Sequence, residues 1–236
     1  MINYHPDQHL LSLHAKGELP LSMSIAIAAH AEFCPHCQQQ LDQMTIALSE
    51  QQFEQGDVKN TTAAEQHVEF DDLLSQFLSS TLDALDTDDS VDSVDSKATS
   101  QPEIIDNSVT IKGQHYPLPR VFKKQINASW QGIGKVSRLR LDTGEPQARA
   151  SLLHIAANGE IPDHTHKGSE LTLLLAGEFS DCYNTYKPGD FMLLDQDHEH
   201  SPKTTEGCLC YTIVDAPLYF TKGISKLLNP IGELLY

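Results

Sequence analysis

The sequence has little positive charge. Its 236 residues include 33 acidic but only 16 basic residues, which gives a formal net charge of −17. Contacts to nucleic-acid phosphates and to anionic lipid head groups depend on a basic face, so we expect neither nucleic acid nor a membrane surface as a direct partner. The hydrophobic fraction, 39%, is below average but sufficient for a buried core. The length allows two domains of ordinary size.

Long apolar runs are also missing. The longest, Ile25–Ala29, is far shorter than the roughly 20 residues that cross a bilayer. The first residues, MINYHPDQHL, lack a basic region followed by an apolar run, so we expect no secretory signal. The five cysteines are odd in number, and two of them form a CxxC. This usage favours thiol or metal chemistry in the cytoplasm over a disulfide framework.

Residues 86–102 separate two halves of different character. This stretch contains five Asp, one Lys and almost no large apolar side chain. It cannot bury enough apolar surface to offset the entropy lost on ordering, so we predict an acidic flexible linker. A domain is therefore expected on each side, over residues 1–85 and 103–236.

Residues 1–85 are predicted to be helical. The expected helices are Asp7–Lys16, Ser22–Phe33, Pro35–Phe53 and Glu69–Leu82. The last has the clearest period, because its large apolar residues fall on one stripe. Pro20 and Pro35 fit the first turns of helices.

Residues 103–236 are predicted to form an all-β sandwich or barrel. Short apolar runs such as ELTLLLAGEF and CLCYTIVDAPLYF are separated by Gly, Pro and Asp, which is typical of short strands joined by turns. The tail, residues 221–236, carries a broken amphipathic stripe that Pro230 interrupts. We expect this tail to pack against the barrel.

A first group of potential metal ligands lies in the segment HAEFCPHC, which contains His30, Cys34 and Cys37. On a helix, residues three and four apart share a face, so a helix start can present an imidazole and two thiolates to one ion. Zinc takes such ligands in a closed tetrahedral structural site. The candidates for a fourth ligand are His5, His9, His14 and His36. The alternative, a redox CxxC or two core cysteines, lacks the βαβ context of a thioredoxin-like motif.

A second group contains His164, His166 and Glu170, followed by His198 and His200. Residues i and i+2 point to the same side of a strand, so the HxH pair suits a β-barrel wall. Three imidazoles and one carboxylate could hold Zn, Fe, Mn, Ni or Cu. The alternative is a set of surface histidines.

Cys208 and Cys210, also at i and i+2, are expected to face one side of a strand. We favour small core residues for this pair. The alternative is a redox pair near the barrel metal.

The sequence resembles two known modules in tandem. HxHxxxE, a glycine seven residues later, a PGD turn and a later His resemble the cupin barrel, although Gly159 stands one residue closer to His164 than usual. The early His followed by HxxxCxxC resembles the zinc-binding anti-sigma domain. In this order and at this length, the two resemble the ChrR family of zinc anti-sigma factors over nearly the whole chain.

This resemblance implies a fold, two metal sites and a partner. The fold would be multidomain α plus all-β, with an N-terminal helical bundle stapled by zinc and a C-terminal cupin barrel. The family's zinc ligands fall on His5, His30, Cys34 and Cys37 in the first domain, and on His164, His166, Glu170 and His200 in the second, with His198 as the fallback for His200. The helical domain would hold an extracytoplasmic-function sigma factor. The cupin would sense singlet oxygen or organic peroxide and permit release.

The charge distribution agrees with a sigma-factor partner. Residues 1–102 carry a net charge of −14, and residues 103–236 only −3. A sigma factor binds DNA and so presents basic faces to which an acidic domain is drawn. A solubilising surface would also be acidic. The competing hypothesis is a metal-dependent cupin enzyme, a dioxygenase or isomerase, with an open metal position.

Overall fold

The computed structural model describes residues 2–56, 107–124, 129–222 and 229. Helices come first in the chain: α1 (Gln8–Ala15), α2 (Leu21–Phe33) and α3 (Pro35–Gly56). Strands follow, with a short 3-10 helix, η1 (Arg120–Lys124), among the first of them. Within the described residues, no helix combines the length and apolar character needed to cross a membrane. The predicted class, α plus all-β, is confirmed.

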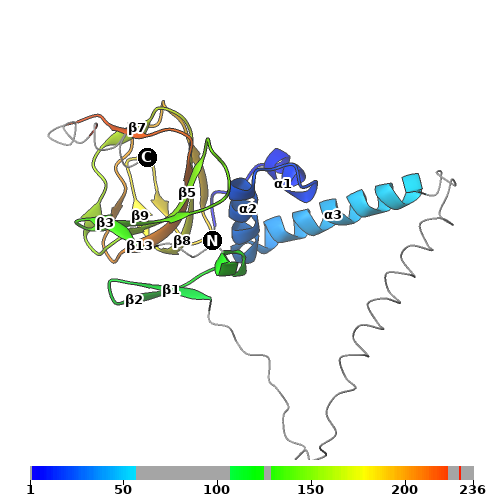
Figure 1. The fold of residues 1–236 in the computed structure, drawn as a ribbon, viewed down its shortest axis with the longest axis horizontal. Coiled ribbons are helices and arrows are strands. Elements are labelled where there is room, and N and C mark those ends of the chain that lie inside the picture. The colour runs from blue at the N-terminus through cyan, green and yellow to red at the C-terminus, as the bar shows by residue number, and fades with distance from the viewer. Residues whose placement is uncertain (1, 57–106, 125–128, 223–228, 230–236) are drawn as a thin grey trace, which may run out of the picture. The chain divides into compact units, whose positions relative to one another are not determined.

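The strands are antiparallel and wrap around a common interior (Figure 1). A six-stranded sheet has the order β11 (Phe191–Leu194), β8 (Glu170–Gly177), β13 (Cys208–Val214), β5 (Arg149–Ile155), β4 (Val136–Leu141), β3 (Gln131–Ile133). A four-stranded sheet has the order β10 (Thr185–Tyr186), β9 (Phe179–Ser180), β12 (Lys203–Thr204), β6 (Gly159–Glu160). The remaining pairs are β7 (His164–His166) with β14 (Leu218–Phe220), and β1 (Ser108–Ile111) with β2 (Gln114–Pro117).

The central strands of the larger sheet are buried on both faces, which explains their continuous apolar runs. On β8, Thr172 and Leu174 face the barrel interior, while Leu171 and Leu173 belong to a core on the outer face. Helix α2 covers that outer face beside β13, and η1 packs against α2. Because successive side chains of a strand point to opposite faces, one set forms the interior of the barrel and the other packs in the core shared with the helices.

Polar contacts hold both ends of helix α2, one to the barrel and one to η1. The side chain of Pro20, the residue before the helix, makes no hydrogen bond that caps the helix N-terminus. Instead the carboxylate of Glu145, from the barrel, accepts hydrogen bonds from the Ser22 N–H at 2.7 Å and the Ser22 hydroxyl at 2.6 Å. Near the other end, Glu32 accepts from the Arg120 N–H at 2.8 Å. An anionic side chain at a helix N-terminus satisfies free N–H groups and complements the helix dipole.

The chain up to Ile46 therefore forms one compact unit with the barrel. The sequence had predicted a helical domain over 1–85, a linker over 86–102 and a barrel domain over 103–236. The boundary at 85, the whole linker and the helix Glu69–Leu82 lie outside the described residues, and so does nearly all of the tail after Lys222. These remain predictions. The packing of α2 on the barrel is a feature that the sequence did not indicate.

Candidate metal centres

The first centre forms where α2 ends and α3 begins. Cys34 has an extended backbone, with φ −118° and ψ 96°, and its N–H still bonds to the His30 carbonyl at 2.9 Å. Pro35 then starts α3, because proline disfavours helix for the residue before it and suits a first helical position. His30 thus lies in the last turn of one helix and Cys37 in the first turn of the next, rather than on one continuous helix face.

This junction brings the four predicted residues together. The candidate ligand atoms of His5, His30, Cys34 and Cys37 all lie within 4.8 Å of one another. His5 Nδ1 is 3.4 Å from the Cys34 sulfur and 3.5 Å from the Cys37 sulfur. The Cys37 N–H donates to the Cys34 sulfur at 3.5 Å. His5 is exposed, whereas the other three are buried.

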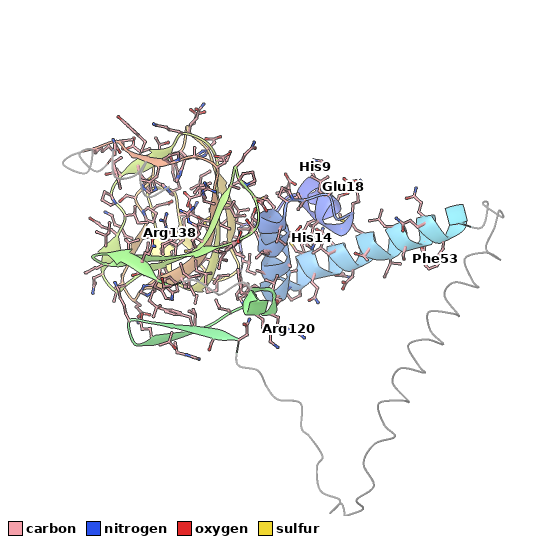
Figure 2. The ribbon with its side chains drawn as sticks, viewed as in Figure 1. His9, His14, Glu18, Phe53, Arg120 and Arg138 are labelled. Carbon is pink, nitrogen blue, oxygen red and sulfur yellow. The ribbon has the colours of Figure 1, made fainter. Side chains whose placement is uncertain are left out.

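The other candidates for a fourth ligand lie outside this group. His36 is exposed, and its Nε2 is 3.3 Å from the Gln40 side-chain nitrogen. His9 and His14 lie on α1 (Figure 2). Among the described histidines, His5 is the one that joins His30 and the two cysteines.

The donor set fits a metal cation. The His30 Nδ1–H donates to the Gly189 carbonyl at 2.7 Å, which leaves Nε2 as a buried nitrogen without a hydrogen-bond partner. Burial lowers the pKa of His30 to about 4, and burial together with the Cys34 hydrogen bond raises the pKa of Cys37 to about 12. Without a cation, His30 is therefore a neutral imidazole and Cys37 a protonated thiol. Two nitrogens and two sulfurs match a tetrahedral zinc site.

The second centre lies inside the barrel. His164 and His166 sit at i and i+2 on β7, and Glu170 begins β8. His200 joins them through a backbone bridge in which its N–H and carbonyl each bond to His164 at 3.0 Å. All four side chains are buried, and their candidate ligand atoms lie within 4.8 Å of one another. His164 Nε2 and His200 Nε2 are 3.0 Å apart.

The choice between His200 and His198 follows from the register of this bridge. His198 lies outward, with its side chain 44% exposed, and its Nδ1 is 2.7 Å from Asp195. Its ring also contacts Tyr183. His200 is therefore placed in the group, and the fallback residue His198 is not.

Three further residues orient this group and were missed by sequence reasoning. Asp181 Oδ2 lies 3.6 Å from His200 Nδ1, the Pro162 carbonyl accepts from His164 Nδ1 at 2.8 Å, and the Thr172 hydroxyl donates to Glu170 at 2.8 Å. Such contacts fix which nitrogen faces the ion. Of these three, only Thr172 could have been found from the sequence, because it lies two residues after Glu170 and therefore on the same face of the strand.

The electrostatics favour an anionic Glu170 beside a neutral His164. Burial acts to raise the pKa of Glu170, but the hydrogen bond and charge of His166, with His200 and His164, lower it to about 2. Burial and the neighbouring His200 lower the pKa of His164 to about 4. Three imidazole nitrogens and one carboxylate oxygen fit a divalent transition metal, without selecting one.

A small, mostly apolar cavity of about 30 Å³ adjoins the group. That volume admits about two water molecules. The polar members of its wall belong to the group or orient it: His164, Glu170, Thr172, Asp181 and His200. The apolar wall is formed by Leu153, Ile155, Ile161, Phe179, Met192, Leu194, Pro202 and Cys210.

Cys208 and Cys210 both face the barrel interior, as their spacing predicted. Both are buried in the interior core, and Cys210 lines the cavity. A hydrogen bond between the two thiols, together with burial, raises the pKa of Cys210 well above its usual value. In this state Cys210 is a protonated core thiol.

Comparison with known proteins identifies the barrel. Residues 124–216 match the family model of the ChrR cupin-like domain. The barrel is therefore similar to the ChrR cupin-like domain over these residues. The chain is also 27% identical over 237 residues to the anti-sigma-E factor ChrR of Cereibacter sphaeroides, and the match covers 99% of both chains. The predicted resemblance to the ChrR family is therefore confirmed.

A solved structure extends the comparison to three dimensions. The crystal structure of Rhodobacter sphaeroides SigE in complex with the anti-sigma ChrR matches with a TM-score of 0.61 and 25% sequence identity. The match covers 91% of this chain and all of that one. The similarity thus includes the helical segment as well as the barrel.

Proposed function

We propose that this chain is an anti-sigma factor that binds an extracytoplasmic-function sigma factor in the cytoplasm and thereby represses transcription. One observation carries the proposal: the chain is similar to the anti-sigma-E factor ChrR over 99% of both lengths. The ChrR of the solved structure is in complex with SigE. The acidic first 102 residues suit a partner with basic, DNA-binding faces. The five free cysteines suit a reducing compartment.

In this proposal the N-terminal centre is a structural zinc site held by His5, His30, Cys34 and Cys37. A bound zinc ion would supply a positive charge and four bonds that tie the N-terminal segment, the end of α2 and the start of α3 together. Two thiolates and two neutral imidazoles would complete its coordination and leave no open position. The role of this centre is then to hold the helical segment in shape for the sigma factor.

The ChrR cupin-like domain would be the sensor. His164, His166, Glu170 and His200 would hold a second metal ion, with zinc as the expected metal. An oxidative signal, singlet oxygen or an organic peroxide, would alter the barrel and weaken sigma binding. One route uses Cys208 and Cys210: a hydroperoxide oxidises the two thiols to a disulfide, and its O–O bond is cleaved to give an alcohol and water. The other route is oxidation at Glu170 and its histidine neighbours.

The competing hypothesis, a cupin dioxygenase or isomerase, receives less support. The relative that matches over 99% of both chains is an anti-sigma factor. A cavity of about 30 Å³ is also small for an organic substrate.

The decisive experiment is co-purification with the extracytoplasmic-function sigma factor whose gene is expected beside this one. The wild-type chain should form a one-to-one complex that represses a sigma-dependent promoter. Cys34→Ser should lose N-terminal zinc and sigma binding, while Cys182→Ser, which alters an exposed thiol outside both metal groups, should retain both. A Cys34→Ser chain that lacks this zinc yet binds sigma tightly would contradict the structural role.

The sensing step is tested separately. The double variant Cys208→Ser, Cys210→Ser should keep basal repression but lose peroxide-driven release if the thiols carry the signal. Release that proceeds as in the wild type would eliminate the thiol route. Glu170→Gln should then show whether the metal group carries the signal.

A further inference from the structure

The N-terminal centre depends on a turn of the barrel. The turn Lys187–Asp190 joins β10 to β11, and its Gly189 carbonyl accepts the hydrogen bond that orients His30. Gly189 has φ +95°, and a Cβ at this position would lie 2.5 Å from the Ile2 side chain and 2.9 Å from Phe33 Cβ. The turn therefore approaches both the N-terminal segment and the end of α2 at a distance that only glycine allows.

The next residue, Asp190, holds the segment that carries His5. Asp190 is completely buried. Its Oδ1 accepts hydrogen bonds from the N–H groups of Asn3 at 2.7 Å and Tyr4 at 3.1 Å, and its Oδ2 accepts from Lys187 N–H at 2.8 Å. These three donors satisfy a carboxylate that would otherwise be costly to bury.

The same segment covers an edge of the sheet. β11 is one of the two edge strands of the six-stranded sheet, and the Phe191 N–H bonds to the Tyr4 carbonyl at 3.1 Å. The Phe191 ring also contacts His30, with 5.9 Å between ring centroids. The barrel thus contacts His30 directly and holds the two residues that precede His5.

We propose that Asp190 is a positioning residue for the N-terminal metal centre. The inference rests on the proposal that this centre binds zinc. His5 is the exposed ligand, and it stands at the start of the chain, where a segment without anchors loses conformational entropy when it binds an ion. Asp190 binds the N–H groups of Asn3 and Tyr4, the two residues immediately before His5, so much of this entropy is already lost when the metal binds. The PGD turn therefore belongs to the support of the helical centre as well as to the barrel.

The test uses cobalt(II) and the full-length chain. Cobalt bound to cysteine thiolates gives a near-ultraviolet charge-transfer band, which reports the N-terminal centre alone because the barrel group contains no thiol. Asp190→Asn places an N–H₂ group among N–H donors and should release the segment. We expect the cobalt affinity of the thiolate centre to fall about 10- to 100-fold, as measured by chelator competition, which is the range for groups that orient metal ligands.

Controls separate positioning from general damage. Asp195→Asn changes an exposed carboxylate that contacts His198, outside both groups, and should leave both affinities unchanged. In Asp190→Asn, the metal affinity of the barrel group should stay within about twofold of the wild type. If Asp190→Asn does not fold, Asn3→Pro provides the second test, because it removes one N–H donor to Asp190 from an exposed residue outside the barrel.

The outcomes are distinct. Wild-type cobalt affinity in both Asp190→Asn and Asn3→Pro would overturn the positioning role and leave the proposed zinc site intact. A wild-type chain that binds cobalt without the thiolate band would overturn the zinc site and the positioning role together. Loss of affinity at both centres in Asp190→Asn and in Asn3→Pro would assign Asp190 to general barrel stability instead.

Discussion

The hydroxyl of Tyr211 donates a hydrogen bond to the carbonyl oxygen of Ser22, 3.0 Å away and 189 residues earlier in the chain. Tyr211 is fully buried on the outer face of β13, and Ser22 lies in the first turn of α2. Burial and the charge of Glu145 raise the pKa of this tyrosine, so it remains a donor under ordinary conditions. The contact joins the helical segment to the centre of the sheet.

Tyr211→Phe should therefore weaken the folded unit. Removal of the hydroxyl deletes one buried hydrogen bond, which costs about 0.5 to 1.5 kcal/mol. Chemical denaturation followed by circular dichroism should show this loss. Tyr219→Phe, at a side chain that is 42% exposed, should change stability by less than about 0.5 kcal/mol. Equal stabilities of the two variants would contradict the importance of the contact.

Glu145→Gln should lower stability through the start of α2. The amide can still accept from Ser22, but it loses the charge that interacts with the helix dipole, so we expect a loss of about 0.5 to 1 kcal/mol. The effect should shrink at high salt, which screens this charge. Glu160→Gln, which removes an exposed carboxylate 3.8 Å from Lys203, should change stability much less in the same melts.

The pair His200→Ala and His198→Ala tests the barrel centre. The two histidines are two residues apart, yet one is buried in the metal group and the other pairs with Asp195 at the surface. His200→Ala should reduce the bound metal by about one ion per chain, measured by mass spectrometry of metals after dialysis. His198→Ala should keep the wild-type content. The reverse result would move the ligand to His198.

The buried His154 predicts a loss of stability in acid. Its Nε2 lies 3.1 Å from the Tyr116 hydroxyl under the β1–β2 hairpin. Burial, and to a smaller degree the Lys112 charge, lowers its pKa from 6.5. Below about pH 6.5, His154 therefore binds a proton in the unfolded chain but not in the folded chain. The free energy of unfolding then falls as pH falls, by at most about 1.4 kcal/mol per pH unit.

His154→Gln should flatten this dependence. Denaturation midpoints between pH 7 and pH 5 measure the slope, which is independent of any constant loss caused by the substitution itself. His115→Gln, at an exposed residue of the neighbouring hairpin, is the control and should keep the wild-type slope. An unchanged slope in His154→Gln would show that this histidine does not contribute.

The local features of the fold could be predicted from the sequence. Pro35 marked the start of α3, and the helices expected at Asp7–Lys16 and Ser22–Phe33 are found at Gln8–Ala15 and Leu21–Phe33. The HxH spacing placed His164 and His166 on one strand face. These predictions succeeded because they depend on backbone preferences and strand periodicity, which act over a few residues.

The contacts between distant segments could not be predicted from the sequence. Glu145 caps a helix more than a hundred residues away, and nothing in its neighbourhood indicates this role. Asp190 was recognised as part of a PGD turn, but a turn motif does not reveal which segment its carboxylate will hold. Such partners are set by the assembled fold, so a single sequence without an alignment carries no signal for them.

Strand β11 has one side chain near each metal centre, so NMR signals from this one strand would report on both centres. The Phe191 ring contacts His30 outside the barrel, while the Met192 side chain, on the opposite strand face, lines the cavity of the inner centre. Leu194, two residues further, pairs with Glu170. Selective isotope labelling of this four-residue strand would therefore give one resonance sensitive to each centre. Loading of either centre could then be followed in the intact chain without labelling the helices.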